Sequence, residues 1–271
     1  MMLKRTLTAL VIAPVLLILL LCPPWVIAIF LAAISVTGVM ELLAHWKNPV
    51  RLSVKILAGA YTVAFLALIY FQASTYLYIG LTFLLVFLLF LEIFRVGDGF
   101  DFGDLCGVFF AAAAIPALYS PVLSIALMEN PKYLVLMPFL VTIISDVFAL
   151  FSGMLFGKHK LAPKVSPNKT IEGAIGGYLM CLAVQLLYAW VLNSLFFMDV
   201  NWHHFLLYGV VCGIVSQLGD LAMSAVKRNL SIKDFGKIFP GHGGILDRFD
   251  SLLFVAPTML AMLTLFPPFK G

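Results

Sequence analysis

Charged side chains are scarce in this sequence. Asp, Glu, Lys and Arg together make up 11% of its 271 residues, whereas soluble domains carry about 25%. Apolar residues make up 63%, and the mean hydropathy is +1.08. So few polar residues could not cover the surface of a water-soluble fold, which excludes a soluble globular protein. The chain is therefore predicted to lie mostly within a membrane.

Cysteine pairs and long polar segments are also missing. The four cysteines lie singly in or beside apolar stretches, and no pair has metal-ligand spacing or indicates a disulfide framework. We interpret them as small buried hydrophobic residues. Every loop is too short to fold alone, so any catalytic site must be built from loop residues and helix ends. The cysteines are Cys22, Cys106, Cys181 and Cys212.

Apolar runs that could cross a bilayer occur nine times. A bilayer core about 30 Å thick requires about 20 apolar residues per helical span. Pro116 and Pro121 interrupt the fifth run, but membrane helices tolerate such residues where neighbours satisfy the freed backbone groups. The first run could instead be a signal peptide, yet no small-residue cleavage site follows it, so we expect an anchored hairpin. The predicted spans are 7–21, 25–44, 54–71, 76–94, 105–127, 133–156, 173–197, 205–226 and 251–266.

The basic residues predict an orientation for these spans. With the N-terminus in the cytoplasm, 15 of the 17 Lys and Arg residues fall on the inner side, and only Lys132 and Lys270 fall outside. The positive-inside rule predicts this asymmetry. We therefore expect an all-α integral membrane protein, a polytopic bundle of about nine transmembrane helices. It would form a single transmembrane domain over 1–271, with N-terminal spans at 1–130 and a catalytic half at 131–271 whose loops 157–172 and 227–250 face the cytoplasm.

Several acids lie within predicted spans. Asp146 lies in the sixth span and Asp220 in the eighth, and ionisable groups within a bilayer are a functional hypothesis by default. Asp220, Ser224 and Lys227 are spaced i, i+4, i+7, so they share one helix face. A proton relay or a structural hydrogen bond would explain either acid alone, but the combined face favours a polar site. Glu41, near the inner end of the second span, is expected to snorkel or to pair with a nearby base.

The loop at 227–250 carries groups that suit phosphates. Its first part holds four cations, which favour phosphate groups or anionic lipid heads. A Pro-Gly-His-Gly-Gly turn follows, and its backbone N–H groups could cradle a phosphate, although such a turn is more often a connector. His242 within it could be a base, a phosphate donor or a histidine bonded to its own loop. The cations are Lys227, Arg228, Lys233 and Lys237.

Acids at the end of this loop complete a metal-assisted site. Asp247 and Asp250 are three residues apart and are expected on the first turn of the ninth helix, where the helix dipole also favours acids. Mg²⁺ prefers one or two carboxylates plus substrate phosphates to a cage made only of protein. Two such ions can clamp the attacking and leaving oxygens of a displacement at phosphorus. Together these features predict a nucleoside triphosphate held through Mg²⁺.

The loop at 157–172 adds further donors for anionic groups. It is not a Walker A loop, because no glycine precedes Lys169 at the required spacing. Its two prolines stiffen it, and its donors are Lys164, Ser166, Lys169 and Thr170. Glycines at four-residue spacing flank the loop and permit close helix packing. They are Gly153 and Gly157 before it, and Gly173 and Gly177 after it.

These loops resemble the signature of the phosphatidate cytidylyltransferase family. The stretch from Phe156 to Gly173 and the tripeptide Gly219-Asp220-Leu221 are also similar to that family. Asp146 matches an acid-x-x-Ala motif, although Leu150 stands where many members carry an aromatic residue, a departure that bears on packing. The main signature reads Ser224-x-x-Lys227-Arg228-x-x-x-x-Lys233-Asp234-x-Gly236-x-x-Phe239-Pro240-x-His242-Gly243-Gly244-x-x-Asp247-Arg248-x-Asp250.

The resemblance implies a reaction in phospholipid synthesis. CTP and phosphatidic acid would give CDP-diacylglycerol and pyrophosphate, with the lipid phosphate attacking the α-phosphorus of CTP. Mg²⁺, as one ion or two, would neutralise the triphosphate, and a monovalent cation is a further candidate. The resemblance also implies a homodimer in the inner membrane of a bacterium, with its active site facing the cytoplasm. We expect no nucleic acid among its partners.

The resemblance also assigns roles to residues of the two loops and the eighth span. The catalytic residues implied are Asp220, Asp247, Lys227 and Arg248. The metal-linked acids implied are Asp220 and Asp247, followed by Asp250 and Asp146. The substrate-binding residues implied are Ser224, Arg228, Lys233, Lys237, His242, Gly243, Gly244, Lys169, Ser166 and Lys164.

Two other functions would also use the polar residues of these spans and loops. A CTP-dependent lipid kinase acting on a polyprenol or similar alcohol would use the same nucleotide but release CDP, so the products distinguish the two. A transporter or channel would line an ion path with Asp146 and Asp220. Inverted repeats with paired broken helices would favour a transporter, and the sequence has none.

Overall fold

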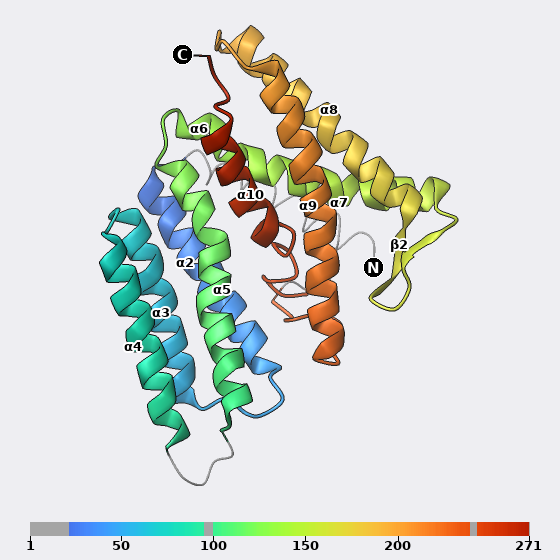
Figure 1. The fold of residues 1–271 in the computed structure, drawn as a ribbon. Helices are drawn as coiled ribbons and strands as arrows, with labels where there is room; N and C mark the ends of the chain where they lie inside the picture. The colour runs from blue at the N-terminus through green and yellow to red at the C-terminus, as the bar shows by residue number, and fades with distance from the viewer. Residues whose placement is uncertain (1–21, 95–99, 239–242, 271) are drawn as a thin grey trace. The chain divides into compact units, whose positions relative to one another are not determined.

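Long apolar helices dominate the structure. In a bilayer, helices satisfy every backbone polar group within one segment, so apolar runs of this length fold as helices. The computed structural model describes residues 22–94, 100–238 and 243–270, and within them seven helices are long and apolar enough to cross a membrane (Figure 1). These are α2 (Pro24–Ala44), α3 (Leu52–Tyr70), α4 (Thr75–Ile93), α5 (Phe102–Ala126), α7 (Leu136–Phe156, continued backwards by the one-turn α6, Pro131–Leu134), α8 (Ile171–Leu195) and α9 (Trp202–Asn229).

The helices confirm a multi-pass membrane protein but not nine complete crossings. The first predicted span, 7–21, lies outside the described residues. The ninth corresponds to α10 (Leu252–Leu265), an apolar helix of only 14 residues. At 1.5 Å per residue a helix of that length reaches about 21 Å, which is less than the roughly 30 Å core of a bilayer. Pro116 and Pro121 lie inside α5 without ending it, as predicted.

Contacts between the helices divide the chain into two compact units. Unit 1 combines the chain up to Lys132 with the segment Leu230–Phe249. Unit 2 combines Tyr133–Asn229 with the chain from Asp250 onwards. The loop predicted at 227–250 is therefore divided between the units, and the single transmembrane domain stays a prediction.

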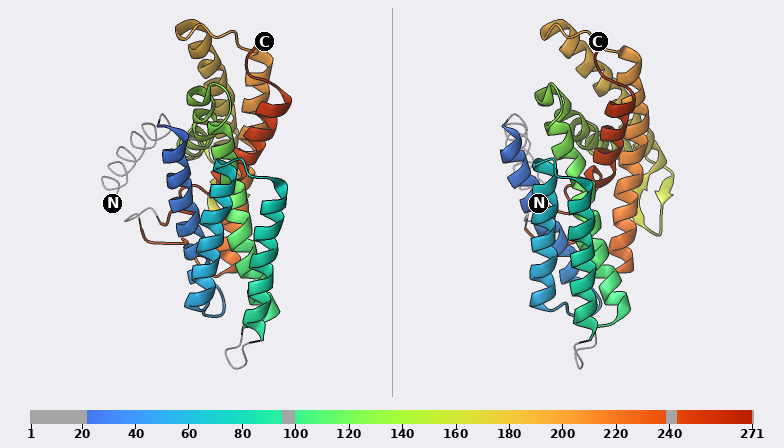
Figure 2. Two further views of the ribbon diagram at one scale, coloured as in Figure 1. Left: turned by 90° about the vertical axis from the view of Figure 1, so that its left-hand side faces the viewer. Right: turned by 60° about the vertical axis from the view of Figure 1, so that its left-hand side comes forward.

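In unit 1, α2, α3 and α5 pack against one another, and α4 packs on α3 and α5 (Figure 2). Polar contacts tie the helix connections together at one end. Asp104, in the first turn of α5, accepts hydrogen bonds from the Trp46 indole (3.0 Å) and the Asn48 amide (2.9 Å). Arg51, before α3, forms a 2.9 Å ion pair with Glu92 of α4. The connection between α2 and α3 is thus fixed by side chains that no local pattern would pair.

In unit 2, α7, α8 and α9 pack against one another, and α10 packs on α9 and α7. The predicted close packing at the glycines is confirmed for α7 and α8. A Cβ on Gly173 would lie 2.6 Å from the Ala149 carbonyl oxygen, and a Cβ on Gly177 would lie 2.7 Å from that of Ser145. Only glycine allows the two backbones to approach this closely.

The loop expected at 157–172 contains a small antiparallel hairpin. Strand β1 (Lys160–Ala162) pairs with β2 (Ser166–Thr170), with Lys160 opposite Thr170. Glu172, at the start of α8, accepts the backbone N–H groups of Lys158 and His159 and closes the base of the hairpin. Thr170 caps α8 by accepting the N–H of Gly173 at 3.1 Å. The hairpin is therefore anchored to α8 at its base.

Candidate active site

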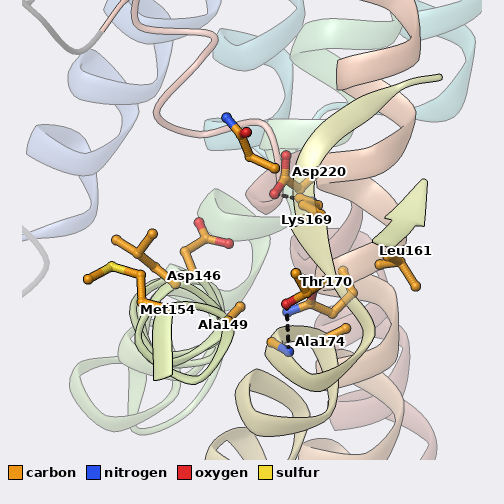
Figure 3. A pocket seen from close by; sticks show the side chains of 13 residues that line it. Asp146, Ala149, Met154, Leu161, Lys169, Thr170, Ala174 and Asp220 are labelled. Carbon is orange, nitrogen blue, oxygen red and sulfur yellow. Dashed lines mark hydrogen bonds and ion pairs between the residues drawn. The ribbon is translucent and has the colours of Figure 1, made fainter. Parts of the chain in front are cut away.

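A cavity of about 410 Å³ lies in unit 2, lined by residues of α7, the hairpin, α8 and α9. Its charged lining consists of Asp146 from α7, Lys169 from β2 and Asp220 from α9 (Figure 3). Leu150 and Met154 form part of its apolar wall, and their side chains are 61% and 64% exposed. Folding therefore brings together two acids that are 74 residues apart in the sequence, Asp146 and Asp220.

Asp220 is held by partners from two elements. The Lys169 ammonium forms an ion pair with Oδ2 of Asp220, drawn as a dashed line in Figure 3. The Ser224 hydroxyl, one turn further along α9, donates to Oδ1 of Asp220 at 3.5 Å. The predicted shared face of α9 is thus confirmed for Asp220 and Ser224.

Asp250 extends the same charged cluster. Its Oδ2 lies 3.6 Å from the Lys227 ammonium at the end of α9, and its Oδ1 accepts the N–H of Ser251 at 2.8 Å. Both side chains are buried. Burial and the nearby Asp220 carboxylate raise the pKa of Asp250 to about 7, against the opposing effect of Lys227. Two carboxylates and two lysines therefore share one partly buried region, and an additional cation would stabilise the charged form of Asp250.

The donor set fits a metal ion that is shared with substrate phosphates. Among the described residues, no three His, Cys, Asp or Glu side chains are grouped closely enough to hold a metal ion by themselves. Asp220 and Asp250 do supply a pair of carboxylates in mutual repulsion. Mg²⁺ commonly binds through one or two carboxylates plus phosphate oxygens. The residues present fit such an ion.

The hairpin is bound to α9 as well as to α8. The Arg228 Nε donates to the Val165 carbonyl at 3.1 Å, so one of the predicted phosphate-binding cations supports the hairpin turn. Lys164 is exposed in that turn, and Ser166 is partly buried at the start of β2. The hairpin that carries Lys169 is therefore held at its base by Glu172 of α8 and at its turn by Arg228 of α9.

The remainder of the predicted site lies in unit 1, where Asp247 ties a loop together. Its Oδ2 accepts the backbone N–H groups of Phe235 (2.7 Å) and Gly244 (2.9 Å). The N–H of Gly244 is therefore directed at Asp247, and the phosphate cradle stays a prediction. Gly243 has a φ of +83°, a left-handed conformation that favours glycine. His242 lies outside the described residues.

The expectation that Asp247 and Asp250 lie on the first turn of the last helix is wrong. Helix α10 begins at Leu252, and both acids lie in the turns before it. The reason is local, because Asp247 accepts N–H groups from elsewhere in its loop, and such bonds compete with helix formation.

The second cavity, of about 640 Å³, lies in unit 1. Lys233 and Lys237 line it from the loop, and Glu41 and His45 line it from α2. Glu41 is a residue whose role sequence reasoning missed. Its partners are the backbone N–H groups of the loop rather than a basic side chain, and its place near the end of an apolar span was the only available signal.

The predicted site residues are thus divided between the units. Unit 2 holds Asp146, Lys164, Ser166, Lys169, Asp220, Ser224, Lys227, Arg228 and Asp250. Unit 1 holds Lys233, Lys237, Gly243, Gly244, Asp247 and the exposed Arg248.

Curated proteins that are similar to this chain are named phosphatidate cytidylyltransferases. The chain is 48% identical over 131 residues to a phosphatidate cytidylyltransferase of Staphylococcus haemolyticus, covering 48% of each chain. It is 47% identical over 131 residues to that of Staphylococcus aureus (strain COL), again covering 48% of each. It is 45% identical over 135 residues to that of Staphylococcus epidermidis (strain ATCC 12228), covering 50% of each. The chain thus spans about half the length of the curated relatives it matches. The model of the Cytidylyltransferase family matches residues 3–266, and the chain belongs to this family.

Proposed function

We propose that this protein is a CTP:phosphatidate cytidylyltransferase, which makes CDP-diacylglycerol and pyrophosphate. The observation that carries the proposal is the cluster of Asp220, Asp250, Lys169 and Lys227, of which Asp250 and Lys227 are buried and the other two partly buried. Two of these residues, Lys169 and Asp220, line a cavity that also has an apolar wall. Family membership and the names of the relatives support the same activity.

The reaction is a displacement at phosphorus. An oxygen of the lipid phosphate would bond to the α-phosphorus of CTP, and the bond from that phosphorus to the bridging oxygen of the β-phosphate would break. Pyrophosphate would leave with the bonding electron pair. Positioning and charge stabilisation are the main requirements of such a transfer. Lys169 and Lys227, which form ion pairs with Asp220 and Asp250 in the structure, would donate to the phosphates of CTP.

Asp220 and Asp250 would hold Mg²⁺ together with the substrate phosphates. When bound, the ion would neutralise negative charge on the triphosphate and on the leaving pyrophosphate. Asp247 and Asp146 stay candidates for the same role. Ser224 would keep the Asp220 carboxylate oriented through its hydrogen bond.

The apolar wall of the cavity supports a lipid substrate. Leu150 and Met154 belong to α7, a helix long enough to cross a membrane, and both are exposed. Exposed apolar side chains on such a helix suit contact with acyl chains. A lipid could then bring its phosphate to Lys169 and Asp220 while its chains stay in the bilayer.

We place this enzyme in the inner membrane of a bacterium, with its active site at the cytoplasmic face. The support is the charge asymmetry of the loops, since most Lys and Arg residues fall on one side of the predicted topology. The relatives named above are bacterial. The homodimer stays a prediction from the family resemblance.

A turnover assay tests the proposal. Purified protein in detergent would receive CTP labelled at the α-phosphate, phosphatidic acid and Mg²⁺. We expect labelled lipid and released pyrophosphate, dependent on both the lipid and the metal, and a loss of both products in Asp220→Asn. Release of CDP would instead indicate a lipid kinase. Folded wild-type protein that produces no labelled lipid would contradict the proposal.

A further inference from the structure

Glu41 binds the backbone of the signature loop. It lies in the last turn of α2 and its side chain is buried, with 7% of the residue exposed. Its Oε1 accepts the N–H of Ile245 and its Oε2 accepts the N–H of Leu246, both at 2.9 Å. Hydrogen bonds from N–H groups to a carboxylate are stronger than those between neutral partners. Both oxygens of one buried acid are thus directed at the two residues that immediately precede Asp247.

Two signature glycines make room for this carboxylate. A Cβ on Gly244 would lie 2.3 Å from Oε1 of Glu41, and the three atoms nearest to it would all belong to Glu41. A Cβ on Gly236 would lie 2.2 Å from the same oxygen. The space that these glycines leave is therefore filled by a side chain from a helix about 200 residues earlier in the chain.

The loop is held by two carboxylates in series. Glu41 binds the N–H groups of Ile245 and Leu246, while Asp247 binds those of Phe235 and Gly244. Asp247 thus joins two arms of the loop, residues 233–237, which carry Lys233 and Lys237, and residues 243–247. Glu41 joins the second arm to α2. Glu41 also lines the cavity of about 640 Å³ that Lys233 and Lys237 border. The geometry around these two cations therefore depends on α2.

We propose that Glu41 is a positioning residue of the cytidylyltransferase reaction, acting through the backbone of residues 244–246. It holds the arm that carries Asp247, and through Asp247 the arm that carries Lys233 and Lys237. This inference rests on the proposed function of the chain. A small displacement of such groups is costly, since a misplacement of about 1 Å can lower a rate about 100-fold.

The first test is a comparison of Glu41→Gln with Glu41→Asp in the full-length protein. Gln offers one acceptor oxygen and puts an amide donor opposite a backbone donor, so we expect kcat of the folded protein to fall about 100-fold. The loss of one N–H acceptor also lowers the midpoint of thermal unfolding, so kcat is measured at a temperature where the variant is fully folded. Asp keeps both acceptor oxygens on a shorter stem, so part of the rate should return. Glu92→Gln is the matched control, because it also removes a carboxylate charge from a helix of unit 1 that does not line the cavity.

The second test uses the contact between Gly244 and Glu41. Gly244→Ala should lower kcat strongly, because its methyl group would meet the Glu41 carboxylate. In the Glu41→Ala background that obstacle is gone, so adding Gly244→Ala should cost little more than Glu41→Ala alone. Non-additivity of this kind identifies direct contact, and it remains measurable if Glu41→Gln folds poorly.

The outcomes separate this inference from the proposed function. Wild-type protein without turnover would defeat the proposed function before any Glu41 variant is assayed. With active wild type, a normal kcat and KM in Glu41→Gln would overturn the positioning role. A loss of activity that only follows the fraction of unfolded protein would also overturn the positioning role, because it indicates a purely structural role for Glu41. Additive effects of Glu41→Ala and Gly244→Ala would overturn the contact on which the argument rests.

Discussion

At the scale of single residues, the important acids differ in what they bind. Asp220 and Asp250 each face a lysine ammonium group, although Asp250 also accepts the N–H of Ser251, whereas Glu41 and Asp247 each accept two backbone N–H groups of the signature loop. A buried carboxylate is stable only where partners compensate its lost hydration. Lysine partners can turn to a substrate phosphate, while backbone partners fix the fold. We infer that the first pair serves the chemistry and that the second pair serves mainly to shape the loop.

The ion pair between Lys169 and Asp220 gives a prediction for activity. Lys169→Gln removes a cation from the cavity and leaves Asp220 without that partner, so kcat should fall about 100-fold, as for the loss of one donor to a developing charge. Lys160→Gln is the control, because Lys160 belongs to the same hairpin and is exposed. Rates of labelled-lipid formation measure both. A Lys169→Gln enzyme with the rate of the control would remove this lysine from the reaction.

Asp247 gives a prediction that separates stability from activity. Asp247→Ala leaves two buried backbone N–H groups without their acceptor, and each such loss costs about 1–3 kcal/mol. Asp247→Asn retains one oxygen that can accept, so its free energy of unfolding should fall less. If Asp247 is metal-linked, both variants lose turnover. Thermal unfolding and turnover, measured on the same preparations, distinguish a structural role of Asp247 from a role in binding the metal. An Asp247→Asn variant with normal turnover would exclude the metal role.

At the scale of elements, the sequence predicted what depends on local pattern. The second span was predicted at 25–44 and the helix runs from Pro24 to Ala44, because hydropathy and length alone determine a crossing. The hairpin at 160–170 was not predicted, since its proline-containing stretch has no strand periodicity and is held by Glu172 and Arg228. The contact of Glu41 could not be predicted either, because nothing local marks a partner about 200 residues away.

The packing of α7 on α8 gives a prediction for stability. Gly177→Ala would place a methyl group 2.7 Å from the Ser145 carbonyl oxygen and 2.9 Å from the Gln217 amide, so the helices must move apart. Overpacking of this kind typically costs about 1–3 kcal/mol. Gly80→Ala is the control, because a Cβ there meets nothing within 4 Å. We expect a lower unfolding midpoint in detergent for Gly177→Ala alone, and equal midpoints would show that the helices do not pack this closely.

At the scale of the whole molecule, the signature divides between two units. The chain leaves unit 2 after Asn229 and returns at Asp250. Lys227 and Asp250 therefore belong to one unit, while Lys233, Lys237 and Asp247 belong to the other. The linear motif predicted which residues matter but not this division, because a motif carries spacing along the chain and no information on packing. Under the proposed function, the loops at 157–172 and 227–250 must lie on the same side of the membrane for their groups to serve one reaction.

Thiol labelling tests that requirement directly. In a variant whose four cysteines are replaced by serine, single cysteines would be introduced as Asn130→Cys, Lys160→Cys and Ser231→Cys, at exposed positions in three connections. Since 15 of the 17 basic residues fall on the predicted inner side, the positive-inside rule places 160 and 231 in the cytoplasm and 130 outside. An impermeant maleimide added to intact spheroplasts should therefore react at 130 alone, and at all three after permeabilisation.

Reaction at 160 and 231 but not 130 would reverse the orientation while keeping the two loops on one side of the membrane. Reaction at only one of 160 and 231 would place the hairpin and the signature loop on opposite faces, and a site that uses Lys169 together with the signature would then be impossible.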